Sequence, residues 1–276
     1  MTVAASPPGG PVRRVPWTQH SLAAPVLGVV GIILFLAVWE VASRTGLVNP
    51  RFFPPASDVL VRLGTDLVSA SFWTSVGQTM TSWIIGLTIS AVAATAIGFL
   101  IGGSNFLRKA THTTIEFLRP IPSVALIPLA VLLFGVSIES ALLLIVYASF
   151  WQILIQVLYG TADVDSVAMD TARSYGLGWW ARVRHVVWPT TLPYLITGLR
   201  LAAAVALVLA ITAELVIGTP GIGKQIELNR SGGSVVAMYS LVLATGIIGV
   251  IINMVMRFIE KRVLRWHASV RKDVAV

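Results

Sequence analysis

The residues that could do chemistry in this chain form no recognisable catalytic or metal-binding pattern. The histidines are far apart in the sequence, at His20, His112, His185 and His267, and the chain contains no cysteine. Metal sites use closely spaced imidazole, thiolate or carboxylate ligands. No nucleophile is paired with a base at a spacing typical of covalent catalysis. We therefore predict that the chain holds no metal and is not an enzyme.

The candidates for a solute path are residues that interrupt apolar stretches, namely Arg119, Pro122, Arg200 and Glu214. An ionisable side chain inside a membrane is costly and by default indicates function. A proline there frees a backbone carbonyl and bends the helix, which is tolerated where protein or a cavity satisfies that carbonyl. Arg119 and Glu214 lie near the ends of apolar runs, so a position at the membrane surface stays the alternative. The two arginines are compatible with an anionic solute but are not evidence for one.

Gly218, Gly223 and Lys224 have most of the spacing of a nucleotide-binding P-loop. In a P-loop, a serine or threonine follows the lysine and binds Mg²⁺, but here that residue is Gln225. An apolar helix, not a β-strand, is predicted to precede the segment. We therefore predict a glycine-rich turn, with no ATP, Mg²⁺ or other cofactor bound by this chain.

One long segment in the middle of the chain, residues 161–193, is too polar to lie in a bilayer. Acidic residues at its start suit the positive end of a helix dipole and predict a short helix there. Gly176 is predicted to end this helix in the left-handed conformation. A second, amphipathic helix on the membrane surface is expected to follow, and Pro189 and Pro193 are predicted to stop it.

The composition predicts that membrane-spanning helices position these residues. Of the 276 residues, 56% are hydrophobic and 12% are charged, about half the charged fraction of ordinary soluble domains. Crossing a bilayer takes roughly 20 apolar residues. Six runs are long enough, at about 22–41, 76–103, 112–134, 139–160, 194–217 and 234–256. We predict an all-α, multi-pass protein of a bacterial-type plasma or inner membrane, with about six transmembrane helices.

The basic residues predict the orientation, because cytoplasmic segments of membrane proteins collect Lys and Arg. With both termini inside, fifteen of the 20 basic residues fall in cytoplasmic segments. The others fall outside, at Arg44, Arg51, Arg62, Lys224 and Arg230. We expect an N-in, C-in topology with the 161–193 loop in the cytoplasm. The net charge of +8 follows from this bias, so no nucleic-acid partner is predicted.

The 161–193 loop resembles the EAA loop of ABC-importer permeases. That family's pattern is Glu-Ala-Ala, three residues, Gly, nine residues, an aliphatic residue, one residue, and Leu-Pro. The same spacing is held here, with Asp for Glu, Thr for Ala and Trp for Leu, by Asp170, Thr171, Ala172, Gly176, Val186, Trp188 and Pro189. The segments FFPPASDVL, LRPIPSVALIPLAVLLFG and AELVIGTPGIG also resemble the permease subfamily for sulfonates, taurine and nitrate.

This resemblance, over about residues 52–260, implies a function and partners. Such a permease forms the translocation pathway for a small anionic solute, and its EAA loop, which extends here to Pro193, docks on a dimer of ATP-binding subunits. Those separate subunits bind ATP and Mg²⁺. An extracytoplasmic solute-binding protein delivers the solute. A second copy of the permease, as a homodimer, completes the pathway.

The layout then predicts four regions. They are a disordered cytoplasmic tail at 1–20, the first transmembrane helix with an extracytoplasmic segment at 21–70, the type-1 permease core at 71–260, and a basic cytoplasmic tail at 261–276.

Gly98 and Gly102 form a small-xxx-small pattern, which we interpret as packing within the chain.

Two other classes stay open. A secondary transporter driven by an ion gradient would show inverted repeats and ionisable groups at mid-membrane, where Glu214 is the only well-placed acid. A membrane enzyme that acts on lipid would need clustered Asp, His or Arg at the membrane surface, and the 161–193 loop lacks a metal-binding acidic cluster.

Overall fold

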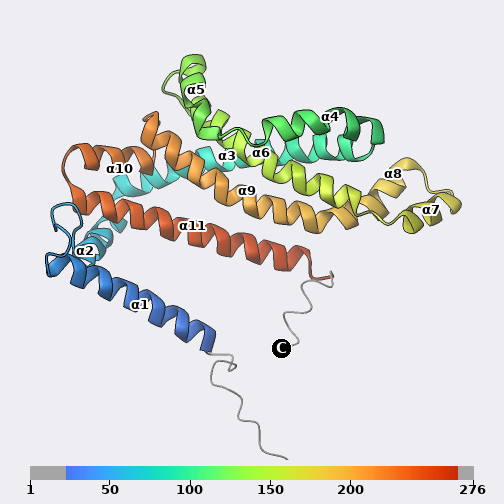
Figure 1. Ribbon diagram of the computed structural model, residues 1–276. Helices are drawn as coiled ribbons and strands as arrows, with labels where there is room; N and C mark the ends of the chain where they lie inside the picture. Colours follow the sequence, from blue (N-terminus) through green and yellow to red (C-terminus); the bar gives the residue numbers. More distant parts are fainter. Residues whose placement is uncertain (1–22, 267–276) are drawn as a thin grey trace, which may run out of the picture. The chain divides into compact units, whose positions relative to one another are not determined.

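The computed structural model describes residues 23–266, and within that range every regular element is a helix. Figure 1 labels these helices in chain order. The chain divides between Asp58 and Val59 into two compact units. The predicted tail at 1–20 and the last residues of the predicted tail at 261–276 lie outside the described residues, and the four predicted regions stay predictions.

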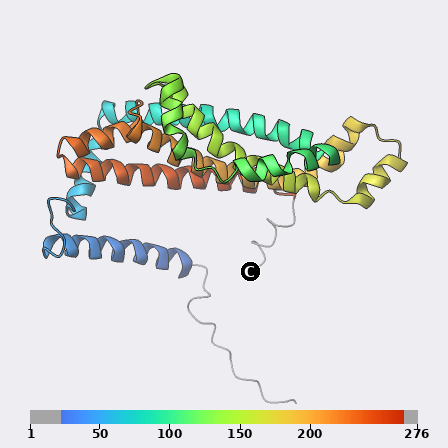
Figure 2. The ribbon, with the colours of Figure 1, turned by 45° about the horizontal axis from the view of Figure 1, so that its top comes forward.

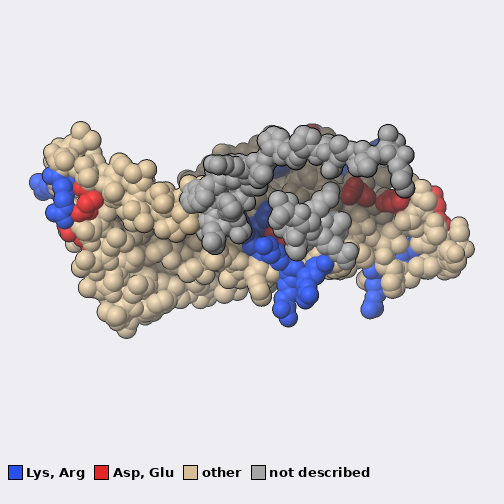
Figure 3. All heavy atoms as spheres, turned by 90° about the horizontal axis from the view of Figure 1, so that it is seen from below, with Lys and Arg blue, Asp and Glu red and all other residues tan. Residues whose placement is uncertain are grey.

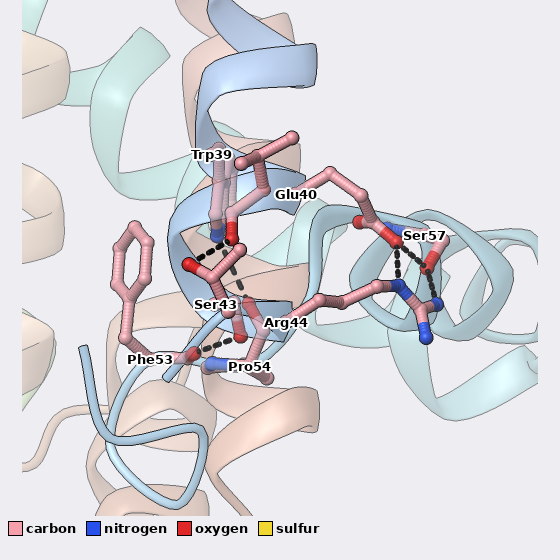
Figure 4. Close-up of polar contacts among 9 residues, drawn as sticks. Trp39, Glu40, Ser43, Arg44, Phe53, Pro54 and Ser57 are labelled. Atoms are coloured by element: carbon pink, nitrogen blue, oxygen red, sulfur yellow. Dashed lines mark hydrogen bonds and ion pairs between the residues drawn. The ribbon is translucent and has the colours of Figure 1, made fainter. Parts of the chain in front are cut away.

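The first unit consists of α1 (Ala23–Arg44), an irregular segment and the first turn of α2 (Ala56–Leu67). Figure 4 shows how side chains near the end of α1 hold the irregular segment and the start of α2. The indole Nε1 of Trp39 donates to the Pro54 carbonyl at 2.9 Å, and the Ser43 hydroxyl donates to the Phe53 carbonyl at 2.7 Å. The backbone N–H of Ser57 donates to Glu40 Oε2 at 3.0 Å, so a carboxylate from α1 satisfies an otherwise unpaired N–H in the first turn of α2.

The second unit is built around three long helices, α3 (Ala70–Gly102), α6 (Ile138–Ala162) and α9 (Trp188–Val216). Figures 1 and 2 both show them running alongside one another, with α11 (Val235–Val263) next to α9. Two clusters of buried side chains hold the three helices together. Their fully buried members include Ala94, Leu144, Ile145, Ile153, Val157, Ala206 and Ala210.

Small residues let α3 and α6 approach closely. The buried positions of α3 recur every three or four residues and are mostly Ser, Thr, Ala or Gly. A Cβ atom added to Gly98 would lie 2.6 Å from Cγ1 of Val157, and one added to Gly102 would overlap Oγ1 of Thr161. Because both partners belong to α6, the interpretation of Gly98 and Gly102 as packing within the chain is confirmed.

The third predicted span is broken. It becomes α4 (Asn105–Leu118), then the short 3-10 helix η2 (Ser123–Leu126) and α5 (Ile127–Phe134), with a bend of 81° between the two parts. The break falls at Arg119–Pro122, where proline removes backbone donors. The described residues contain five helices long and apolar enough to cross a membrane, or up to six if the bent pair is one span. The all-α prediction with about six spans is therefore confirmed, and the direction of crossing stays a prediction.

The prediction that Pro189 and Pro193 stop the second loop helix is wrong. The π-turn η3 (Val183–Val187) joins α8 (Trp179–Arg182) directly to α9, so that Trp179–Val216 is one candidate span of 38 residues. In the π-turn the N–H of Trp188 donates to the Val183 carbonyl, five residues back. This wider turn moves the preceding carbonyls away from the Pro189 ring, and Pro193 costs α9 only one backbone bond.

Charged side chains are sparse on one face of the molecule (Figure 3). In the face shown in Figure 3, Lys and Arg gather in separate groups, and most of the remaining described surface carries no charge of either sign. This distribution is typical of helices that face lipid along their length and water at their ends.

Candidate functional site

The loop after α6 begins with a well-capped helix. In α7 (Ser166–Ser174), the side chain of Asp165 accepts a hydrogen bond from the Val167 N–H at 2.8 Å, as an N-cap residue does. The predicted short helix opened by acidic residues is therefore present. Figures 1 and 2 both show α7 and α8 projecting beyond the end of the long helices.

Gly176 ends α7 in the predicted left-handed conformation, with φ of +72°. Its N–H donates to the Arg173 carbonyl at 2.9 Å, and the Leu177 N–H donates to the Ala172 carbonyl at 3.0 Å. These two bonds form a Schellman motif, which pairs carbonyls that a helix end leaves free. The turn is therefore defined by backbone bonds and a glycine, and it joins α7 to α8 as a fixed corner.

The surface of α7 carries both charge and apolar area. Asp170 is exposed and pairs with Arg173 at 2.9 Å, Thr171 is exposed, and Ala172 is buried. Large side chains beside them are open, since Tyr175 is 81% and Trp180 is 72% exposed. Exposed aromatic side chains next to charged ones are typical of a surface that binds another protein.

The remaining loop residues of the pattern lie apart from this surface. Val186 is in the π-turn, and Pro189 and Pro193 lie on the first turns of α9, half-buried. The hydroxyl of Tyr194, the next residue on α9, donates to Asp163 Oδ2 at the end of α6 at 2.9 Å. The structure thus groups Asp170, Thr171 and Gly176 at the tip of the loop and places the prolines at its base.

Glu214 is buried within the protein, with 1% of its surface exposed, and so is not a surface residue. Its Oε2 atom accepts hydrogen bonds from the Thr79 hydroxyl at 2.9 Å and from the Gly223 N–H at 2.8 Å. Thr79 in turn accepts from the Ile222 N–H at 3.0 Å. Ile222 and Gly223 open α10 (Ile222–Ser231), so side chains of α9 and α3 cap its first turn.

The glycine-rich segment before α10 is a turn that fits around this carboxylate. Gly218 and Gly221 both have positive φ, of 84° and 156°. A Cβ atom added to Gly221 would overlap the carboxyl group of Glu214. The place that an anionic ligand takes at a helix N-terminus is thus filled by the chain's own carboxylate. This geometry accounts for the P-loop-like spacing without a nucleotide.

The other end of α10 carries an ion pair between Glu227 and Arg230. The Arg230 guanidinium, with help from the Ser231 hydroxyl, lowers the pKa of the Glu227 carboxyl to about 2. Glu227 is therefore ionised at neutral pH. In both Figure 1 and Figure 2, α10 lies at the end of the long helices opposite to α7 and α8.

The other predicted path residues are not gathered with Glu214. Arg200 on α9 forms an ion pair with Glu260 on α11 at 2.8 Å, so its charge is neutralised. Arg119 is exposed and lines a cavity of about 580 Å³ with Arg108, and Pro122 precedes η2. The residues that sequence reasoning missed are the partners Thr79 and Glu260, whose roles depend on contacts far along the chain, whereas Gly223 was identified only as part of a turn.

Within residues 23–266, no three His, Asp or Glu side chains come together as metal ligands. The polar features of the site are therefore the exposed loop tip, the buried Glu214 cluster and the Arg200–Glu260 pair.

The comparisons with known proteins agree with these features. The family described as "Binding-protein-dependent transport system inner membrane component" matches residues 94–265. The taurine transport system permease protein TauC of Escherichia coli is 27% identical over 94% of this chain and 96% of its own length. The nitrate import permease protein NrtB of Synechococcus elongatus is 27% identical over 91% of this chain and 93% of its own length.

Two solved structures share the fold. A crystal structure of an amino acid ABC transporter with histidines matches 70% of this chain and 94% of its own, with a TM-score of 0.58 and 17% identity. An inward-facing structure of the MetNI methionine ABC transporter matches 70% of this chain and 92% of its own, with a TM-score of 0.53 and 18% identity. At these identities the likeness shows the arrangement of helices.

Proposed function

Because the chain belongs to the family of binding-protein-dependent transport system inner membrane components, we propose that it forms the translocation pathway of an ATP-driven ABC importer. The chain lies in the inner membrane and is the permease subunit, and a separate subunit hydrolyses ATP. The relatives that support this proposal cover more than nine tenths of the chain, so the likeness extends over the whole bundle and not only its loop.

The proposed solute is a small anion such as taurine, an aliphatic sulfonate or nitrate. The support comes from the named substrates of TauC and NrtB, and of the putative aliphatic sulfonates permease SsuC of Escherichia coli, which is 28% identical over 89% of this chain. Of the two arginines predicted to lie on the path, Arg119 is the one open to such an anion, because Arg200 is paired with Glu260.

The proposed coupling element is the 161–193 loop. Its tip carries Asp170 and Thr171 on the exposed side of α7. The Schellman motif at Gly176, which joins α7 to α8, makes this tip a rigid projection. Its base runs through η3 and Pro189 into α9 without a break. A force on the tip is therefore transmitted into a membrane helix and not absorbed by a flexible linker. This continuity is the observation that carries the proposal.

Three partners complete the proposed importer. A dimer of ATP-binding subunits, which binds ATP and Mg²⁺, docks on the loops in the cytoplasm. A solute-binding protein delivers cargo at the opposite face, where α10 lies. A second copy of this chain forms the other half of the pathway, as a homodimer.

The experiment that tests this proposal is co-purification of the tagged chain with a candidate ABC ATP-binding subunit in detergent. We expect a stable complex with the wild-type chain that is lost with Asp170→Lys, which reverses the charge at the tip. It should also be lost with Gly176→Pro, because proline cannot adopt a positive φ or donate the bond to Arg173. Lys109→Asp, a charge reversal outside the loop, is the control. A complex that survives both loop substitutions would remove the coupling assignment.

The alternative is a secondary transporter driven by an ion gradient. The observation that favours it is the buried Glu214, whose Oε1 atom has no hydrogen-bond partner among residues 23–266. Proteoliposomes separate the two functions. Uptake that needs the ATP-binding subunit and internal ATP supports the importer, whereas uptake by the chain alone under an imposed proton or sodium gradient supports the alternative.

A further inference from the structure

A groove lies between the last turns of α3 and the segment that leads from α7 into α9, and its volume is about 590 Å³. One part of its lining is apolar and the other part is basic. The apolar part includes Ala96, Phe99 and Leu100 of α3 and Val183, Val187 and Trp188 across from them, and the basic part is Arg173 and Arg182.

Arg182 is the charge in this groove that lacks a partner. Its Nε atom is buried and has no hydrogen-bond partner within residues 23–266. Arg173, in contrast, is paired with Asp170. Among the described residues that line the groove, none is acidic. Because Arg182 lines the groove and has no acidic partner there, the groove is suited to an occupant that brings an anionic oxygen.

The apolar part of the groove lies where a membrane helix meets the polar loop. The candidate span of α3 ends at Gly102, which lines the groove, and Trp179, Trp180 and Trp188 line it as well. Trp side chains concentrate at the membrane–water interface. The rings of Phe99 and Trp188 stack at 5.5 Å and form an apolar wall. An occupant with an anionic head and an apolar chain matches both parts.

We propose that this groove binds an anionic phospholipid, whose phosphate contacts Arg182 and whose acyl chain lies along Phe99 and Trp188. A protein partner fits the groove less well, because Asp170 and Tyr175 of the proposed docking surface do not line the groove, and that surface shares only Arg173 and Trp180 with it. Met169 lines the groove, whereas Asp170 and Tyr175 are exposed. A free phosphate shares the charge of the lipid but leaves the apolar part empty. The bound lipid joins the end of α3 to the loop and so sets how firmly the base of the loop is held.

The test uses the purified full chain in detergent, incubated with equal amounts of phosphatidylglycerol and phosphatidylcholine and examined by native mass spectrometry. We expect the wild-type chain to retain phosphatidylglycerol about fivefold more than phosphatidylcholine, since a basic residue near the bilayer surface favours anionic lipid by that amount. Arg182→Gln should abolish this preference. The matched control is Arg184→Gln, which removes the same charge from an exposed side chain outside the groove and should leave the preference unchanged.

A second variant tests the apolar part without altering charge. Ala96→Trp fills the α3 side of the groove at an exposed position, so the folded chain should elute as the wild type does but retain less of either lipid. Lipid retention by the wild type and by these variants is measured on the chain alone, so it fails or succeeds independently of the proposed transport function.

Five outcomes would overturn the lipid proposal. These are equal retention of the two lipids by the wild type, an unchanged preference in Arg182→Gln, an equal loss in Arg184→Gln, and unchanged retention of both lipids by the folded Ala96→Trp variant. The fifth is displacement of the lipid by inorganic phosphate or by an added ATP-binding subunit, which would show that the groove holds a free anion or a protein. If Arg182→Gln fails to fold, the wild-type comparison and Ala96→Trp decide the question without it.

Discussion

The hydroxyl of Thr79 on α3 donates to the carboxylate of Glu214 on α9, across 135 positions of sequence, at 2.9 Å. The same hydroxyl accepts the first N–H of α10, and the same carboxylate oxygen accepts the second. Three helices therefore meet at two side chains in a buried site. A carboxyl group at this depth is tolerated because its Oε2 atom accepts from a hydroxyl and from a backbone N–H at the start of a helix.

We expect Thr79→Val to destabilise the protein by about 1–3 kcal/mol for each buried polar group that it leaves unpaired. Valine has nearly the same shape but can neither donate to Glu214 nor accept from Ile222. The measurement is the thermal unfolding midpoint of the purified chain in detergent. Thr81→Val is the control, because the Thr81 hydroxyl is exposed and bonds only to the Gly77 carbonyl of its own helix. Equal effects of the two substitutions would contradict the bridging role of Thr79.

We expect Gly223→Ala to displace α10. The added methyl group would lie 2.5 Å from the Ile211 carbonyl oxygen and 2.7 Å from Cβ of Glu214. Such overpacking lowers the free energy of unfolding by about 1–3 kcal/mol, and here it also breaks the hydrogen bond from the Gly223 N–H to Glu214. The observable is faster proteolysis or hydrogen exchange in α10. Gly246→Ala on α11, where no atom lies within 4 Å of the added Cβ, should leave both unchanged.

The features that could be predicted from sequence are those that a short stretch determines by itself. The apolar runs predict the membrane helices because burial in lipid depends on length and composition. Gly176 was predictable because few residues other than glycine accept the left-handed end of a helix. Asp165 was predictable as a helix opener for a similar local reason.

The features that escaped prediction depend on distant partners or on local rules that compete. Glu214 could be identified as unusual, but Thr79 was one hydroxyl among many on α3 until the fold brought them together. Glu260 lies among basic residues near the end of α11, and only the packing of α11 on α9 pairs it with Arg200. The prediction that Pro189 stops the second loop helix is wrong because a π-turn, which has no clear sequence signal, precedes this proline.

We expect Gly98→Ala to destabilise the contact of α3 with α6, because its methyl group would lie 2.6 Å from Cγ1 of Val157. Valine cannot rotate out of the way, since its branched side chain has few rotamers. Val157→Ala removes Cγ1 but keeps Cβ, which lies 2.9 Å from the added methyl group, so it should relieve the worse part of the clash and make the double variant more stable than Gly98→Ala alone. The thermal unfolding midpoint measures both effects. Gly77→Ala on the same helix, with no atom within 4 Å, should instead stabilise the helix slightly, by at most about 1 kcal/mol. A double variant no better than the single would mean that the clash is not with Val157.

We expect Arg200→Glu and Glu260→Arg each to lower stability and solute uptake, because each puts two like charges between α9 and α11 where the native ion pair lies at 2.8 Å. The double exchange restores opposite charges and should recover most of the loss. Both groups are partly exposed, so the interaction is worth about 1 kcal/mol. The measurements are the thermal unfolding midpoint and uptake by proteoliposomes with the complete importer. If Arg200 instead binds the solute, the double exchange will recover stability but not uptake.

We expect Gly176→Ala to weaken association with the ATP-binding subunit, whereas Gly178→Ala should not. Gly176 has a φ of +72°, at which a Cβ atom costs about 1–2 kcal/mol. Gly178 lies two residues further along with a φ of −62°, where alanine is unstrained, and neither position has an atom within 4 Å of the added methyl group. The two substitutions therefore add the same atom to the same exposed corner and differ only in backbone strain.

A titration of the ATP-binding subunit against each variant in nanodiscs measures the difference. The two dissociation constants should differ roughly five- to thirtyfold if the partner recognises the conformation of this corner. Equal weakening by both would point to contact with the corner's surface and away from its conformation, and no weakening by either would mean that the partner does not bind at the tip of the loop.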